Sequence, residues 1–272
     1  MFLEHAERMI KAGINNLRVF FIIISLYKTF DILFNYEREI VNKQLKIHMA
    51  KKLLLSFLKG ILAGLAIGLG GLFYILSVHY IPGEWGKIVG AILFPIGLTI
   101  VCVCALHLYT GKIGLVFEKK QTKEFYLSLP LMLLGNAVGA IALGYLLMFI
   151  LKDAPITDTI KTIAESRTNL NTVNDYLSLI VKSFLCGIFV YLAVRSFAFS
   201  KNKVIGILLL FVFIFAFVYL SCQHCIANMF YLAINNSYAD YHAYINLGIC
   251  ILMNSFGPLP AVLLLKLFKT DF

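Results

Sequence analysis

Polar residues interrupt two apolar stretches of this chain, and these two interruptions decide the fold. The first reads His107-Leu108-Tyr109-Thr110-Gly111, and the second reads Ser221-Cys222-Gln223-His224-Cys225-Ile226-Ala227-Asn228-Met229. A histidine inside an apolar run is costly in lipid, and such residues face protein or a water-filled path. The two segments therefore predict a polar path through a membrane.

The composition of the chain fits this setting. Of the 272 residues, 60% are hydrophobic and only 14% are charged, and the mean hydropathy is +0.86. A transmembrane helix needs about 20 mostly apolar residues. An all-α polytopic membrane protein is predicted, with a channel domain over residues 53–270. Its six predicted spans cover residues 54–78, 88–117, 125–151, 177–199, 204–232 and 244–268.

The distribution of lysine and arginine predicts the orientation. These residues gather before residue 53, at 119–123, at 195–203 and at Lys266 and Lys269, whereas the other connections are poorer in them. Connections rich in Lys and Arg stay in the cytoplasm. Both termini are therefore predicted to be cytoplasmic, in a multi-pass protein of the inner (plasma) membrane. This bias explains the net charge of +10, so no binding to nucleic acid is predicted.

Residues 1–52 are predicted to form a separate cytoplasmic region. The apolar run 19–27 is flanked by Arg18 and Lys28 and is too short to span a bilayer. An amphipathic helix that lies in the membrane interface is the favoured interpretation. The alternatives are a seventh span and a targeting segment.

An internal repeat relates the two halves of the channel domain. Residues 56–61 (SFLKGI) are echoed by residues 183–188 (SFLCGI), and Asn136-Ala137-Val138-Gly139 is echoed by Asn254-Ser255-Phe256-Gly257. Three spans separate each element from its copy, and an odd number of crossings reverses direction. Two inverted repeats are predicted, about 53–151 and 177–268, with broken second and fifth helices and a site between them. Chance similarity of Leu- and Gly-rich helices is the alternative.

The two interrupted segments are expected to favour a negatively charged ligand. Irregular backbone at membrane depth is tolerated where it lines a cavity, and the helix ends it creates point their dipoles inward. Helix N-termini attract negative charge. Ser221, His224 and Asn228 can satisfy backbone groups that the second interruption frees.

Several segments resemble a known family. Leu108-Tyr109-Thr110-Gly111, the run His224 to Phe230 (HCIANMF) and the run Gly135 to Ala140 (GNAVGA) match elements of the formate/nitrite transporter family, which includes formate, nitrite and hydrosulfide channels. The resemblance covers roughly residues 52–268. It implies an aquaporin-like fold in a homopentamer, with one path per protomer for small monovalent anions of weak acids, transported passively or with a proton.

The resemblance also implies roles for six residues. They are the outer constriction Phe94 and Phe217, the inner constriction Leu98 and Leu108, and the central polar pair Thr110 and His224. Apolar rings reject hydrated ions. A histidine between them, with an ordinary pKa of about 6.5, can hold or donate a proton.

The chain departs from the family pattern at three places. His107 and Gln223 stand where the family carries acids, so this centre is less acidic. The lysine of the family's outer connection falls at Asn171 by count. Arg167 is the predicted replacement as vestibule cation and Lys182 is a weaker candidate; the alternative is that this role is absent. The predicted supporting residues of the centre are Asn136, Asn228, Asn254, His107 and Gln223.

An intramembrane haem or metal redox protein is the competing class. It would use His107, His224 and the cysteines, of which Cys222 and Cys225 flank His224. The other four cysteines also lie inside apolar spans, where cysteine behaves as a small hydrophobe. No metal site, no cofactor and no enzymatic activity are therefore predicted.

Overall fold

The computed structural model describes residues 2–268, and the chain divides into two compact units, residues 1–52 and 53–272, each described by itself. Residues 2–52 belong to helix α1 (Phe2–Tyr80). The apolar face predicted for residues 19–27 lies outside the described side chains. All interactions described below lie within the second unit.

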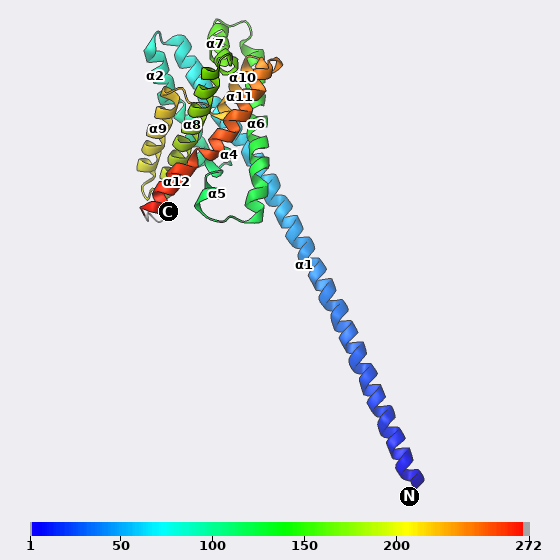
Figure 1. The fold of residues 1–272 in the computed structure, drawn as a ribbon. Coiled ribbons are helices and arrows are strands. Elements are labelled where there is room, and N and C mark those ends of the chain that lie inside the picture. Colours follow the sequence, from blue (N-terminus) through cyan, green and yellow to red (C-terminus); the bar gives the residue numbers. More distant parts are fainter. Residues whose placement is uncertain (1, 269–272) are drawn as a thin grey trace. The chain divides into compact units, whose positions relative to one another are not determined.

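Every regular element of the described chain is a helix (Figure 1). After α1 come α2 (Glu84–Leu93), α3 (Pro95–Val103), α4 (Tyr109–Lys112), α5 (Leu115–Glu118), α6 (Lys123–Leu151), α7 (Thr157–Thr168), α8 (Val173–Phe199), α9 (Lys203–Tyr219), α10 (Cys225–Ile234), the 3-10 helix η1 (Ser237–Ala239), α11 (Tyr241–Phe256) and α12 (Pro258–Leu267).

Five helical stretches of the described residues are long and apolar enough to cross a membrane. They are Lys43–Tyr80, Glu84–Val103, Lys123–Leu151, Val173–Phe199 and Tyr241–Leu267. Helices α9 and α10 are apolar but shorter, because the five residues 220–224 between them are not helical. Helix α8 packs against both α9 and α11, and α6 packs against α10 (Figure 1).

Two pairs of helices approach so closely that only glycine fits between them. A Cβ on Gly64 of α1 would overlap the carbonyl oxygen of Asn136 in α6. A Cβ on Gly187 of α8 would lie 2.6 Å from the carbonyl oxygen of Asn254 in α11. Small residues allow membrane helices this approach. Each contact brings a buried asparagine, Asn136 or Asn254, against the backbone of the facing helix.

Helices α3 and α9 end in the same hydrogen-bonded turn. Ala105 (φ 49°) and Ser221 (φ 52°) both have left-handed backbone. The following amides reach five residues back, from Leu106 to the Val101 carbonyl at 2.9 Å and from Cys222 to the Phe217 carbonyl at 3.0 Å. This is the Schellman arrangement, which satisfies carbonyls at a helix end. The chain then runs without helix over residues 106–108 and 222–224.

The connection between the third and fourth predicted spans contains a helix that the sequence analysis did not predict. Helix α7 covers Thr157–Thr168 and carries Arg167 in its last turn. Helix α8 then starts at a capping box, in which Thr172 and Asp175 each accept a hydrogen bond from the other's backbone amide. The position of Arg167 is therefore set by a helix rather than by a loose loop.

The left-handed residue at the end of α3 gives a test of the first turn. A non-glycine residue costs about 1–2 kcal/mol in this conformation, so Ala105→Gly is expected to raise the thermal unfolding temperature of the purified protein by a few degrees. Ala142→Gly in the middle of α6, an exposed helical position, is the control and should lower stability by about 0.5–1 kcal/mol. Equal destabilisation by both changes would contradict the assigned backbone conformation.

Candidate anion pathway

Asn136 holds the first non-helical segment in place. Its side-chain Nδ2 donates to the carbonyl oxygens of Gly60 at 2.8 Å and His107 at 2.9 Å. Its Oδ1 accepts from the backbone amide of Tyr109 at 2.8 Å. One fully buried side chain thus satisfies backbone groups on both sides of Leu108 and ties them to α1.

Asn254 does the same for the second segment. Its Nδ2 donates to the carbonyl oxygens of Ser183 at 2.8 Å and Gln223 at 2.9 Å. Its Oδ1 accepts from the backbone amide of Cys225 at 2.9 Å. The two asparagines therefore bind their segments through the same three kinds of hydrogen bond, around Leu108 in one case and around His224 in the other.

Thr110 and His224 meet between these two segments. The Oγ1 of Thr110 lies 2.8 Å from Nε2 of His224, and the two residues are only 1% and 3% exposed. The backbone amide of Ala227 donates to Nδ1 of His224 at 3.2 Å, so the ring caps α10. Because Nδ1 accepts, a neutral ring carries its proton on Nε2 and donates it to Thr110. The hydroxyl hydrogen of Thr110 is then free to reach another acceptor.

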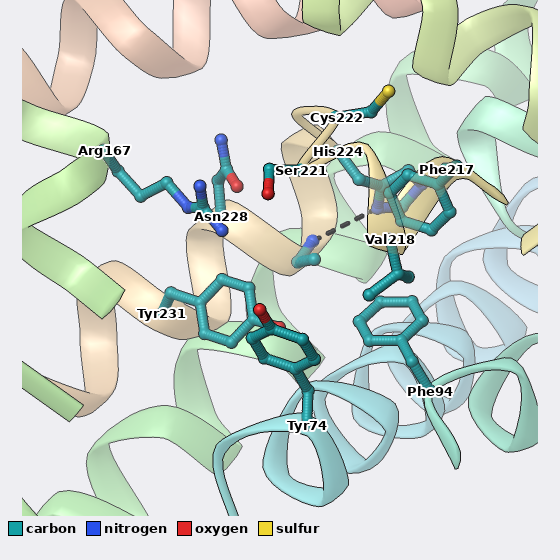
Figure 2. A pocket seen from close by; sticks show the side chains of 11 residues that line it. Tyr74, Phe94, Arg167, Phe217, Val218, Ser221, Cys222, His224, Asn228 and Tyr231 are labelled. Carbon is teal, nitrogen blue, oxygen red and sulfur yellow. Dashed lines mark hydrogen bonds between the residues drawn. The ribbon is translucent and has the colours of Figure 1, made fainter. Parts of the chain in front are cut away.

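A cavity of about 30 Å³ lies beside His224 (Figure 2). We call it the Arg167 cavity; it has the volume of one water molecule in the liquid. Phe94 and Phe217 meet at its wall edge to face, with ring centroids 5.5 Å apart. The Phe217 ring is also 6.1 Å from the His224 ring. The structure thus brings the predicted outer constriction directly next to the central pair.

Arg167 reaches this cavity from α7 (Figure 2). Its guanidinium lies 5.3 Å from the centre of the Tyr231 ring, a cation-π contact. Its Nε is buried and has no hydrogen-bond partner among the described residues. Lys182 does not line the cavity, and its carbonyl accepts from the Gln223 amide at 3.4 Å. The geometry thus favours Arg167 over Lys182 as the vestibule cation.

Gln223, which departs from the family's acid, belongs to a network of amide side chains. Nδ2 of Asn228 donates to Oε1 of Gln223 at 2.7 Å and to Oδ1 of Asn246 at 2.8 Å. All three side chains are buried. Gln223 can accept as a carboxylate would, but it adds no charge. The sequence analysis did not identify Asn246. The signal that could have found it is an amide side chain inside the last apolar span.

The predicted inner constriction borders a second cavity. Leu98 and Leu108 are both 2% exposed, and Leu108 lines a cavity of about 190 Å³, which we call the Lys112 cavity. Leu98 lines neither cavity. His107 is turned to Ser56, with Nδ1 and Oγ 3.2 Å apart, and does not line this cavity.

The lining residues that the sequence analysis did not predict include Tyr74 and Tyr231 of the Arg167 cavity and Lys112 of the second cavity. The tyrosines gave no signal because aromatic residues are common throughout these spans. Within the part of the chain that the structure describes, no three His, Cys, Asp or Glu side chains gather as a metal site.

The sequence and the fold of this chain can be compared with those of known proteins. The family model described as "Formate/nitrite transporter" matches residues 37–267. The chain belongs to this family. The match confirms the predicted resemblance, a multi-pass membrane protein and a transport protein rather than an enzyme or a redox protein.

Curated relatives agree with this membership. The chain is 27% identical over 199 residues to the uncharacterized transporter YrhG of Bacillus subtilis, covering 69% of this chain and 72% of the relative. It is 29% identical over 227 residues to the formate-nitrite transporter of Plasmodium falciparum, covering 74% and 72%. With the formate channel FocA of Haemophilus influenzae it shares 26% over 191 residues, covering 66% of each.

Solved structures share the fold. A pentameric formate channel with formate bound superposes with a TM-score of 0.69 at 21% identity, over 81% of this chain and 99% of that one. An FNT family ion channel gives a TM-score of 0.64 at 21% identity, over 80% and 90%. The all-helical fold of apolar helices is therefore that of these channels.

Loss of one asparagine clamp should be costly. Asn254→Leu removes the two hydrogen bonds that Nδ2 donates and the one that Oδ1 accepts from the Cys225 amide, and it leaves that amide unpaired in a buried place. We expect a loss of at least about 2–4 kcal/mol, measured by thermal unfolding in detergent. Asn171→Leu, at an exposed position, is the matched control. Equal unfolding temperatures for both variants would contradict the role of Asn254.

Proposed function

We propose that this protein carries small monovalent anions of weak acids, such as formate, nitrite or hydrosulfide, across the membrane. The observation that carries the proposal is the buried Thr110–His224 hydrogen bond, next to the Phe94–Phe217 pair and the Arg167 cavity. This arrangement offers a cation, an apolar constriction and a hydrogen-bond donor in succession. Relatives that are formate channels by name support the choice of anion class.

We further propose a six-span topology of two inverted repeats in an aquaporin-like arrangement. Helices α9 and α10 together would make the span that neither can make alone. The matching hydrogen bonds of Asn136 and Asn254, and the matching left-handed Ala105 and Ser221, support the repeat. The bias of Lys and Arg supports cytoplasmic termini in the plasma membrane.

We propose a homopentamer with one path in each protomer. The support is the fold shared with a channel that is titled pentameric. Many large apolar side chains of the described unit are exposed, among them Phe149, Val212 and Leu263, and they need lipid or a neighbouring protomer to cover them.

In the proposed path, Arg167 draws the anion from one side. The anion then sheds water at Phe94 and Phe217, since hydrated ions do not pass apolar rings. At the centre, the free hydroxyl hydrogen of Thr110 donates to it, while Nε2 of His224 donates to Thr110. Leu98 and Leu108 form the second apolar barrier.

The cap that His224 makes on α10 bears on how a proton moves. A proton added at Nδ1 would displace the hydrogen bond from the Ala227 amide. The observed geometry is that of a neutral ring, so it favours an anion that passes while hydrogen-bonded to the central pair. A proton that travels with the anion would then come from the vestibule side rather than from a charged His224.

Transport is tested with purified protein in lipid vesicles and a panel of the three anions. Thr110→Val keeps the shape but loses the hydroxyl, and we expect flux to fall at least about tenfold, as for loss of one buried hydrogen bond to a substrate. Thr110→Ser should keep most of the flux. No flux of any panel anion through the unaltered protein would refute the proposal.

The role of His224 in transport is tested with a variant that keeps the fold. His224→Asn retains an acceptor suited to the first position of a helix cap, yet it lacks the ring nitrogen that reaches Thr110. We expect about a tenfold loss of flux with the thermal unfolding temperature kept near that of the parent. His48→Asn, at an exposed position, is the control. Unchanged flux in His224→Asn would remove His224 from the mechanism.

Capture by Arg167 predicts a change in apparent affinity rather than in maximal flux. Two unit charges about 4 Å apart attract by about 1 kcal/mol when water screens them fully, so Arg167→Gln should raise the half-saturating anion concentration at least about fivefold. Lys182→Gln removes a charge outside the cavity and is the matched control. If Lys182→Gln has the larger effect, the vestibule cation is assigned wrongly.

A further inference from the structure

The Lys112 cavity is separate from the Arg167 cavity. The two cavities have no lining residue in common. His224 lines the first, whereas Leu108 and Gly111, which flank Thr110 in the chain, line the second. The Thr110–His224 hydrogen bond therefore joins the walls of two separate cavities.

Lys112 is the charged residue of this second cavity. It is half-buried, ends α4 and lines the same cavity as Leu108 of the predicted inner constriction. No hydrogen bond or ion pair joins it to any residue that the structure describes, and none of the lining residues is acidic. The ammonium group faces a cavity that gives it no counter-charge.

The surroundings add positive charge instead. Lys59 and Arg195 lie close enough to act on Lys112 electrostatically. The nearby acid Glu118 forms an ion pair with Arg195, with Nε and Oε1 2.8 Å apart. Nζ of Lys59 donates to the carbonyl oxygen of Ala105, itself a lining residue, at 3.2 Å. Lys59 thus brings a second uncompensated cation to the edge of the cavity.

An ammonium without a partner at membrane depth is expensive. A small anion in the cavity would relieve that cost. The volume of about 190 Å³ equals roughly six water molecules at about 30 Å³ each, which is enough for a small anion with part of its water. Cavities with apolar walls and charge of one sign also raise the local concentration of the opposite ion.

We propose that Lys112 binds the permeating anion in this cavity, as a second anion site across the central pair from Arg167. The identity of the anion rests on the proposed function, but the existence of an anion-attracting cavity does not. Two cations would then flank a neutral polar centre, so an anion arriving from either side would meet a positive charge before an apolar constriction.

Thiol labelling tests the charge of the cavity without any transport. Ala198 is an exposed lining residue, and Ala198→Cys in a background with Cys102→Ser and Cys104→Ser places a reactive thiol there. The rate of modification is compared between a sulfonate methanethiosulfonate and a trimethylammonium methanethiosulfonate of similar size. Each forms a mixed disulfide with the thiol and releases methanesulfinate.

The sulfonate reagent is expected to react faster in the Lys112 protein, relative to the cationic one. Lys112→Gln should lower this rate ratio on the order of fivefold, since one nearby charge acts on both reagents with opposite sign. Lys112→Arg should keep the ratio. Lys119→Gln, at an exposed position outside the cavity, is the matched control.

A ratio unaffected by Lys112→Gln, or a thiol that reacts with neither reagent, would overturn the proposal. Anion uptake by the same variants then separates the two hypotheses. With transport present, Lys112→Gln should lower uptake several-fold at low anion concentration and little at saturation. With no uptake in the unaltered protein, the proposed function fails, and the labelling ratio still decides whether Lys112 makes an anion-attracting cavity.

Discussion

A backbone that leaves the helix inside a membrane must find hydrogen bonds within the protein, because lipid supplies none. Asn136 and Asn254 meet this demand here. Each clamps the two residues around a helix start, and the residues that follow are placed as a result. Thr110 comes directly after the held amide of Tyr109, and His224 directly before that of Cys225. The hydrogen bonds that Asn136 and Asn254 make to the two non-helical segments therefore also position Thr110 and His224.

The same constraint explains the neutral polar centre. Gln223 contributes its carbonyl to Asn254 and its side-chain oxygen to Asn228, so backbone support and side-chain network share one residue. A charge at this position would be buried among the amides of Asn228 and Asn246. The cations lie instead at the two cavities, where Arg167 and Lys112 face space that water or an anion can fill.

Much of this could be predicted from the sequence, for physical reasons. Apolar length marks the membrane helices, and His224 and Asn228 stand out because polar groups in lipid are expensive. The repeated Asn136 and Asn254 are visible as a sequence echo. Helix α7 was hidden because its residues are polar and lack a strong apolar period. Lys112, which lines a cavity, and Asn246, which accepts from Asn228, were hidden because such contacts join helices far apart in the chain, and residue type alone does not reveal them.

His224 has two partners with different purposes, the Ala227 amide at one ring nitrogen and Thr110 at the other. The first partner belongs to α10, which His224 caps, and the second belongs to α4. Two separate requirements therefore restrict which residue can replace His224. A replacement must accept at the helix start and also reach across to the other half of the molecule. Few side chains meet both conditions, so few replacements of His224 can keep both hydrogen bonds.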